Sequence, residues 1–529
     1  MTKILVVALD ACDPDTIRAM AADGEVPTLA RLLDESASAT TRNPYGLFVG
    51  SLWSSFFTAR TAARTGFHCW EEVDTKTYER RLTSPLEIRG TPFWETLSAA
   101  GKRVAVLDVP HSKAKPLNGV MVCEYACHDR HFGFHTSPPA LAKEIETEIG
   151  LTPILTAEPH LVRDWAPDDY LHRDGDHRTA DEERALTHGL VDGIELKTQL
   201  STQLLAKGDW DLFLTVYGES HSIGHQQWHL HDHGHRAYDV ALGKELDPIR
   251  SVYRQLDVAI GEHLALTEQD TTVFVLLSHG MGPRYEGSHL LHELLRLLDQ
   301  AESDGYRGSS LKRFAKRKVS DLPGLASGVL PFLRRRLARD PLPAVPNWAT
   351  PEQRARQRYF LSPNNFVFGG VRINLEGREP SGVVKRADYD AVCDQLSEDL
   401  LALVNVETGE PVVRAVSRTS DHYDREADDS LPDLLIDWGR SGPIETVWSP
   451  KTGVVHGPDT HWRTGDHRPD GLLLASGPGF TPGASLSDMD VVDFGASLSG
   501  MLGVTLGEDT DGRVLDWASE SSRTPARSE

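Results

Sequence analysis

Four apolar runs constrain the fold of this chain more than any other feature. They lie at 4–10 ("ILVVALD"), 103–109 ("RVAVLDV"), 211–219 ("DLFLTVYGE") and 272–278 ("TVFVLLS"). Each run is almost continuously apolar, which is typical of a strand that is covered on both faces. Segments with helical spacing lie between them, including 27–36, 91–101 and 251–267. This alternation predicts an α/β fold, a three-layer sandwich with a mostly parallel central sheet between helices.

The 529 residues are expected to form one catalytic domain with an insertion. The catalytic domain would span 1–300 and 360–515, and a basic helical insertion would occupy 303–350. That insertion has ten Lys and Arg residues between Arg307 and Arg339 but only one acidic residue in the same stretch. It is either a solvated lid or oligomer surface, or a cap or membrane-surface helix pair that attracts anions. The tail at 518–529 is expected to be disordered.

Charge and composition exclude some partners. A net charge of −23 argues against a nucleic-acid duplex, whose phosphates need a basic surface. No apolar run is long enough for a membrane span, and the N-terminus is typical of a core strand and not of a signal peptide. The five cysteines are odd in number and scattered, which favours a reduced protein of the cytoplasm. The sequence allows a homo-oligomer and does not determine the oligomeric state.

Polar side chains follow the predicted strands at the points where these end. In parallel sheets, ligands bind at the carboxyl ends of the strands. The residues at or near such ends are Asp10, Glu219, His221, His225, Ser278, His279 and His467. Imidazole and carboxylate groups suit zinc, manganese or iron, and two histidines four residues apart share one face of a helix. The pattern therefore predicts a metal site.

Each of these residues has a simple structural interpretation when it is taken alone. Asp10 could cap a helix, His279 could be a buried core residue, and Ser51 could be a helix N-cap. Ser51 lies in "GLFVGSLWSSFFTAR", just before an apolar helical stretch, where a hydroxyl beside a metal would be an activated nucleophile. The occurrence of such residues at successive strand ends favours the metal site over these separate explanations.

The sequence resembles the type I phosphodiesterase/nucleotide pyrophosphatase branch of the alkaline phosphatase superfamily. The matching stretches follow the family's order from residue 1 to about residue 500: "VVALDACDPDTI", "VGSLWSSFFTAR", "FLTVYGESHSIGHQQW", "LLSHGMG" and "GDHRPDGLLLASGPG". The resemblance implies an alkaline-phosphatase-like sandwich and two divalent metal ions, typically zinc, beside a Thr or Ser nucleophile. It also implies metal-ligand roles for Asp10, His225, His279 and His467, with His456 and His461 as rivals of His467.

Three positions depart from the family pattern. His221 and Ser278 stand where the family has aspartates, and Val49 stands at the usual nucleophile position. Ser51 is the nearest hydroxyl, so it is either a shifted nucleophile and metal ligand or the site has none. With two carboxylates lost, the chain would hold one or two ions. One alternative is a site of three histidines, His221, His225 and His467, with an open position for water.

Further residues are expected to assist. Glu219, read as part of a strand, would point to the same side as His221 and act as ligand, partner of an imidazole or general base. Ser278 is expected to contact the substrate, and His128 and Asp129 are expected to contact either the substrate or each other.

Together these features predict a cytoplasmic, metal-dependent hydrolase with a small anionic substrate. Phosphodiesters or nucleotide-like pyrophosphates are the expected substrates, Ser51 the expected nucleophile and Zn²⁺ the expected ion, with Mn²⁺ or iron as alternatives. Two other functions stay open. One is sulfate-ester or phosphonate hydrolysis, or a specialised biosynthetic reaction, on the same scaffold. The other is metal binding without catalysis.

Overall fold

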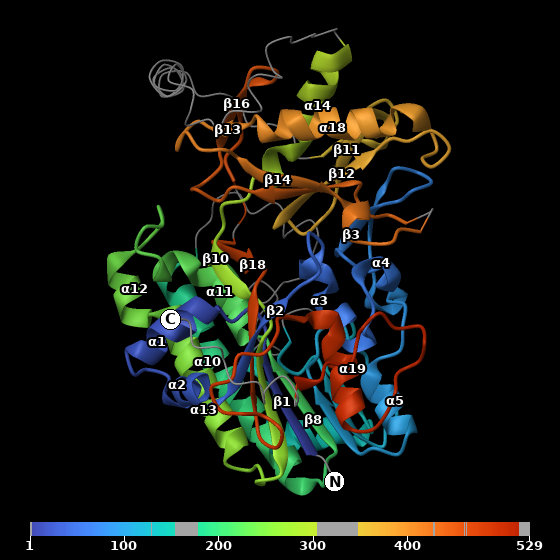
Figure 1. Cartoon of the computed structure of the whole chain (residues 1–529). Coiled ribbons are helices and arrows are strands. Elements are labelled where there is room, and N and C mark those ends of the chain that lie inside the picture. The colour runs from blue at the N-terminus through green and yellow to red at the C-terminus, as the bar shows by residue number, and fades with distance from the viewer. Residues whose placement is uncertain are drawn as a thin grey trace, which may run out of the picture.

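The computed structural model describes residues 3–127, 130–153, 178–303, 348–426, 429–459, 461 and 463–517 (Figure 1). His128 and Asp129, most of the basic segment 303–350 and the tail 518–529 lie outside these ranges, so the predictions made for them stay predictions. None of the helices in the described ranges combines the length and the apolar character needed to cross a bilayer. The five cysteines are buried and free.

A nine-stranded sheet forms the centre of the larger part of the molecule. Strand β1 (Lys3–Leu9) lies between β8 (Leu212–Tyr217) and β9 (Thr271–Leu277) and is parallel to both. The other strands are β20 (Met489–Asp490), β2 (Ala37–Arg42) and β19 (Gly471–Ser476) on the β9 side, and β5 (Val104–Leu107), β6 (Gly119–Cys123) and β7 (His135–Ser137) on the β8 side. Only β19 and β7 run antiparallel to their neighbours.

Helices cover both faces of this sheet (Figure 1). Successive residues of β1 face opposite sides: Leu5 and Val7 belong to one hydrophobic core, whereas Ile4 and Val6 belong to the other. The first core is closed by α1 (Pro14–Ala22), α2 (Pro27–Glu35), α10 (Ala180–Lys207), α11 (Glu219–His231) and α13 (Pro248–Leu264). The second is closed by α3 (Phe48–Thr58), α5 (Phe93–Ala99) and α19 (Val491–Met501). The predicted α/β sandwich with a mostly parallel sheet is confirmed.

A second, smaller unit lies beyond the carboxyl ends of the central strands (Figure 1). Its antiparallel sheet has the order β11 (Tyr359–Ser362), β12 (Phe368–Ile373), β15 (Leu434–Trp438), β14 (Val413–Arg418). Helices α14 (Ser288–Ser303) and α18 (Tyr389–Leu401) pack against it in a core of their own. A three-stranded sheet of β13 (Val404–Asn405), β16 (Thr446–Ser449) and β17 (Gly453–His456) adjoins it. The sequence analysis placed these residues within the catalytic domain and did not separate this unit.

Short elements complete the described chain. The helices are α4 (Ala62–Thr65), α6 (Ala140–Glu148), α12 (Val240–Leu246) and α17 (Pro351–Arg354), with 3₁₀ turns at Pro85–Glu87, Arg386–Asp388 and Thr419–Asp421. Two-stranded ribbons are formed by β3 (Glu71–Val73) with β4 (Arg80–Leu82), and by β10 (Gly280–Pro283) with β18 (Gly465–Arg468). The β10–β18 ribbon lies at the carboxyl edge of the central sheet, where it carries part of the candidate site.

Candidate metal centre

Asp10 is the residue at which the site is organised. It follows β1 directly and is 1% exposed. Its Oδ2 lies 2.9 Å from His221 Nδ1, and its Oδ1 accepts hydrogen bonds from Trp53 Nε1 and Ser278 Oγ, both at 3.1 Å. The next residue, Ala11, has a left-handed backbone (φ 52°), so the chain turns sharply after the carboxylate. These donors hold both oxygens of the Asp10 carboxyl group in place.

Helix α11 supplies two imidazoles from one face. It begins directly after β8, the neighbour of β1, and carries His221 and His225 one turn apart, with ring centres 4.6 Å apart. The Nδ1 of His225 lies 2.9 Å from the carbonyl oxygen of Gly465. Because a carbonyl and a carboxylate oxygen accept, each ring places an N–H on Nδ1, so Nε2 is the nitrogen with which each ring can bind a ligand.

The other two imidazoles come from the β10–β18 ribbon. His279 precedes β10, and His467 on β18 is paired with Met281. The His279 ring lies with its centre 4.4 Å from that of His467, and its Nε2 is 3.6 Å from Asp10 Oδ1. The predicted convergence of Asp10, His225, His279 and His467 at one edge of the sheet is therefore what the structure shows.

Three of these imidazoles have the geometry of a metal site. The ligand nitrogens of His221, His225 and His467 all lie within 4.8 Å of one another. His221 Nε2 and His467 Nε2 are 3.2 Å apart. Two nitrogens that bind one zinc ion tetrahedrally at about 2.0–2.1 Å lie about 3.3–3.4 Å from each other. The three residues fit a divalent ion with little rearrangement.

The protonation state of His467 also fits a ligand. Burial lowers its pKa well below the usual value of 6.5, and the neighbouring His279, His225, His221 and Arg463 lower it further. Its Nδ1 is buried and has no hydrogen-bond partner among the described residues. A neutral imidazole is the form that binds a metal ion.

A second ion of the kind that the family resemblance implies has fewer ligands. Of the residues expected to hold it, Asp10 and His279 are in place, but Ser278 uses its hydroxyl to donate to Asp10 and to accept from the Ala11 N–H. Ser278 was expected to contact the substrate; the structure places it as a support of Asp10. Val49 shares a face of α3 with Trp53, four residues on, whose indole contacts Asp10. The apolar side chain of Val49 thus lies on the face of α3 that carries Trp53, which is where a nucleophile would be needed.

Ser51 does not take that place in helix α3. The helix begins at Phe48 and not after Ser51, so the expectation that Ser51 precedes or caps the helix is wrong. At about 100° per residue, Ser51 lies on nearly the opposite side of the helix from Trp53. Its wholly buried hydroxyl donates to the Leu47 carbonyl at 2.7 Å. The role of Ser51 as nucleophile or ligand stays a prediction.

The side chain of Glu219 also points away from the histidine cluster. It was read as a strand residue, but β8 ends at Tyr217 and Glu219 is the first residue of α11, so it projects about 200° away from His221 instead of to the same side. Its Oε1 lies against Gly193 of α10. Although burial alone would lower the pKa of Lys197, the carboxylates of Asp108 and Glu219 raise it. The position of Glu219 suits charge compensation of Lys197 better than proton transfer in the histidine cluster.

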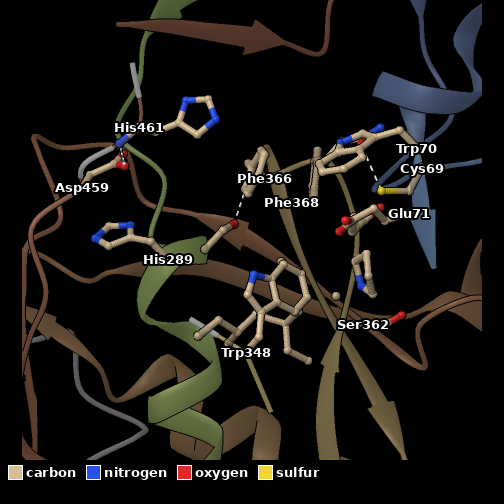
Figure 2. A pocket seen from close by; sticks show the side chains of 18 of the residues that line it. Cys69, Trp70, Glu71, His289, Trp348, Ser362, Phe366, Phe368, Asp459 and His461 are labelled. Carbon is tan, nitrogen blue, oxygen red and sulfur yellow. Dashed lines mark hydrogen bonds between the residues drawn. The ribbon is translucent and has the colours of Figure 1, made fainter. Parts of the chain in front are cut away.

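A pocket that opens to solvent lies close to the histidine cluster. The ring of Phe48 separates the two: its centre is 5.5 Å from that of His279 and 6.3 Å from that of Phe368, which lines the pocket. Figure 2 shows the lining side chains, which come from the loop before β3, from the start of α14, from the segment before α17, from β11, β12 and the loop between them, and from the segment before β18. They include Trp70, Trp348, Phe366, Phe368, His289 and His461.

Comparison with family models supplies the assignment. The model of the type I phosphodiesterase/nucleotide pyrophosphatase family matches residues 4–470. The chain belongs to this family. The resemblance seen in the sequence is confirmed, and so is the prediction of an enzyme of the phosphoester hydrolase class.

Comparisons with individual proteins are more distant. No curated protein matches the chain. Among solved structures, murine ectonucleotide pyrophosphatase/phosphodiesterase 5 is similar at 14% identity and a TM-score of 0.45, over 98% of this chain and 99% of its own. The human protein of the same name gives 11% and 0.47, over 98% of both chains. Phosphonoacetate hydrolase from Sinorhizobium meliloti gives 14% and 0.44, over 93% and 94%.

One residue beside the cluster escaped the sequence analysis. Arg463 Nη1 lies 3.2 Å from His225 Nε2. The sequence reasoning assigned no role to Arg463. The sequence reasoning likewise assigned no role to Trp53, whose indole N–H donates to Asp10.

Proposed function

We propose that this member of the phosphodiesterase family is a metal-dependent hydrolase of phosphate esters that works with one divalent ion. The ion would be held by His221, His225 and His467. The observation that carries the proposal is the convergence of their ligand nitrogens within 4.8 Å inside a buried site. An ion with three protein ligands keeps a position open, as catalytic zinc sites do.

The ligand set favours zinc. Three neutral imidazoles suit Zn²⁺, with Mn²⁺ or iron as alternatives. The Asp10 carboxylate accepts a hydrogen bond from His221 Nδ1, which orients the imidazole ring and raises its basicity. A second ion is disfavoured, because Ser278 and Val49 bring neither charge nor a good ligand to the side of Asp10 and His279.

In the proposed hydrolysis the ion, the nucleophile and the pocket have separate roles. When bound, the ion would supply Lewis acidity to a phosphoryl oxygen and to the nucleophile. No hydroxyl lies on the face of α3 that carries Val49 and Trp53, so we propose water as the nucleophile, and Ser51 is the alternative. The pocket behind Phe48 would receive an organic group of the substrate, which favours diesters or nucleotide-like pyrophosphates over simple monoesters.

Metal analysis combined with a substrate panel tests this function. Purified chain, stripped with chelator and reloaded, should hold one zinc per chain and hydrolyse bis(4-nitrophenyl) phosphate faster than 4-nitrophenyl phosphate. His467→Ala should lose zinc affinity by more than the roughly 10–100-fold that loss of an outer-sphere partner costs. His188→Ala, an exposed histidine on α10, is the matched control. Activity that survives complete metal removal would overturn the proposal.

The same panel separates the related chemistries. A sulfate ester and a phosphonate belong in it, because the altered ligand set differs from the family pattern at His221 and Ser278. Faster turnover of either compound than of the diester would assign that chemistry to the chain instead.

A further inference from the structure

We propose that Arg463 is an oxyanion-binding residue, and that it makes the binding of the metal ion and of a phosphoryl group cooperative. The proposal rests on the one-ion function above. Arg463 Nη1 donates to His225 Nε2 at 3.2 Å. Because His225 Nδ1 bonds to the Gly465 carbonyl, Nε2 is the nitrogen that His225 would use to bind the ion. One lone pair cannot serve both, so metal binding must move the guanidinium off His225.

The backbone places Arg463 at this spot. The Thr464 N–H donates to the carbonyl oxygen of His225 at 2.8 Å, and the Gly465 carbonyl accepts from His225 Nδ1 at 2.9 Å. This close approach requires glycine at 465, because a Cβ there would lie 2.2 Å from the Gly224 carbonyl oxygen. The segment 463–465 is therefore fastened to α11 beside His225, and Arg463 stays within reach of the ion after it has moved.

Once the Arg463 guanidinium has moved off His225, the charges at the site favour the binding of an anion. Guanidinium remains protonated at all relevant pH values, so an ion at His225 would face a positive charge a few ångströms away. A phosphoryl oxyanion between the ion and Arg463 would neutralise both cations at once.

Arg463 thus supplies charge that a second ion would otherwise bring. Its planar fork of N–H donors matches two oxygens of a phosphoryl or phosphonate group. Because linkage is reciprocal, an anion that draws Arg463 away from His225 must tighten metal binding by the same factor by which metal tightens anion binding.

Calorimetric titration with methylphosphonate, a probe that the enzyme does not cleave at an ester bond, measures this coupling without turnover. The probe is titrated into zinc-loaded and metal-free wild-type chain, and into Arg463→Gln, Arg463→Lys and the surface control Arg18→Gln, all with zinc content measured. We expect zinc to tighten methylphosphonate binding in the wild type. Arg463→Gln should weaken binding to the loaded chain by roughly 10–100-fold, as for loss of a charge-assisted hydrogen bond. Arg463→Lys should recover part of that affinity, and Arg18→Gln should match the wild type.

The zinc titration without phosphonate gives an independent readout. Arg463→Gln should bind zinc more tightly than the wild type, because a competing donor and a repelling charge are gone. If Arg463→Gln retains wild-type affinity for methylphosphonate on the loaded chain, the inference is overturned while the one-ion function stands. If the wild type binds no zinc at the three histidines, the proposed function is overturned and the inference falls with it.

Discussion

Replacing Ser278 by aspartate tests why this family member should hold one ion. The substitution restores the carboxylate that the family pattern has beside the histidine of residue 279. Ser278 Oγ lies 3.1 Å from Asp10 Oδ1, so the new carboxyl would face a buried carboxylate. Without an ion to separate them, one of the two groups must take up a proton at neutral pH.

The structure sets the size of the effect. Two unit charges at 3.1 Å in an effective dielectric constant of about 20 repel by roughly 5 kcal/mol. Proton uptake at pH 7 by a carboxyl of ordinary pKa near 3.9 costs only about 4 kcal/mol. Because protonation costs less than repulsion, the loss of unfolding free energy should not exceed about 4 kcal/mol. Ser278→Ala, which removes the hydrogen bond to the Asp10 carboxyl and the one from the Ala11 N–H, should lose about 1.5–3 kcal/mol.

Urea unfolding of the metal-free variants at several pH values distinguishes repulsion between two carboxyl groups from the loss of hydrogen bonds. In Ser278→Asp the carboxyl pair has a raised pKa in the folded state, so the folded chain binds more protons than the unfolded chain. Its deficit relative to the wild type should therefore shrink as the pH falls from 7 towards 4, by about 1.4 kcal/mol per unit, whereas that of Ser278→Ala should stay constant.

Zinc analysis completes this test. Ser278→Asp should take up a second zinc ion, held by the new carboxyl with Asp10 and His279, and should regain stability on loading. A wild-type chain that already binds two ions, or a Ser278→Asp deficit that does not change with pH, would refute the reasoning.

Three further predictions concern other parts of the molecule. Ser51→Ala should keep at least about half of the turnover rate in a steady-state assay if water is the nucleophile, and a loss beyond about 100-fold would assign the attack to Ser51. Gly465→Ala should keep the fold, checked by circular dichroism, but weaken zinc binding, because the Cβ would lie 2.2 Å from the Gly224 carbonyl oxygen and push the segment off His225; unchanged zinc affinity would contradict this. Burial lowers the pKa of His263 to about 4, so the unfolded chain binds its proton more tightly, and unfolding free energy should fall by roughly 3 kcal/mol as the pH drops from 6.5 to 4. His263→Gln should remove that part of the pH dependence in urea titrations.

The local sequence determined the layers and the edge of the sheet that carries the site. Near-continuous apolar runs of this length that alternate with helical segments favour strands buried on both faces, and parallel neighbours bring their carboxyl ends together. For this reason Asp10, His225, His279 and His467 could be predicted to converge although they lie far apart in the chain. The spacing of His221 and His225 likewise predicted that one helix face carries both.

Only the tertiary structure decided which way the remaining side chains point. Strand β8 ends at Tyr217, two residues before the end of the predicted strand. Glu219 therefore lies beside α10 and not beside His221. The start of α3 at Phe48 set the rotation that directs Val49, and not Ser51, towards the Asp10 side. Arg463 reaches His225 because Gly465 lets one backbone touch another. Hydrophobic periodicity fixes the type and order of elements, but helix rotation and close backbone approach depend on contacts between segments that are remote in sequence.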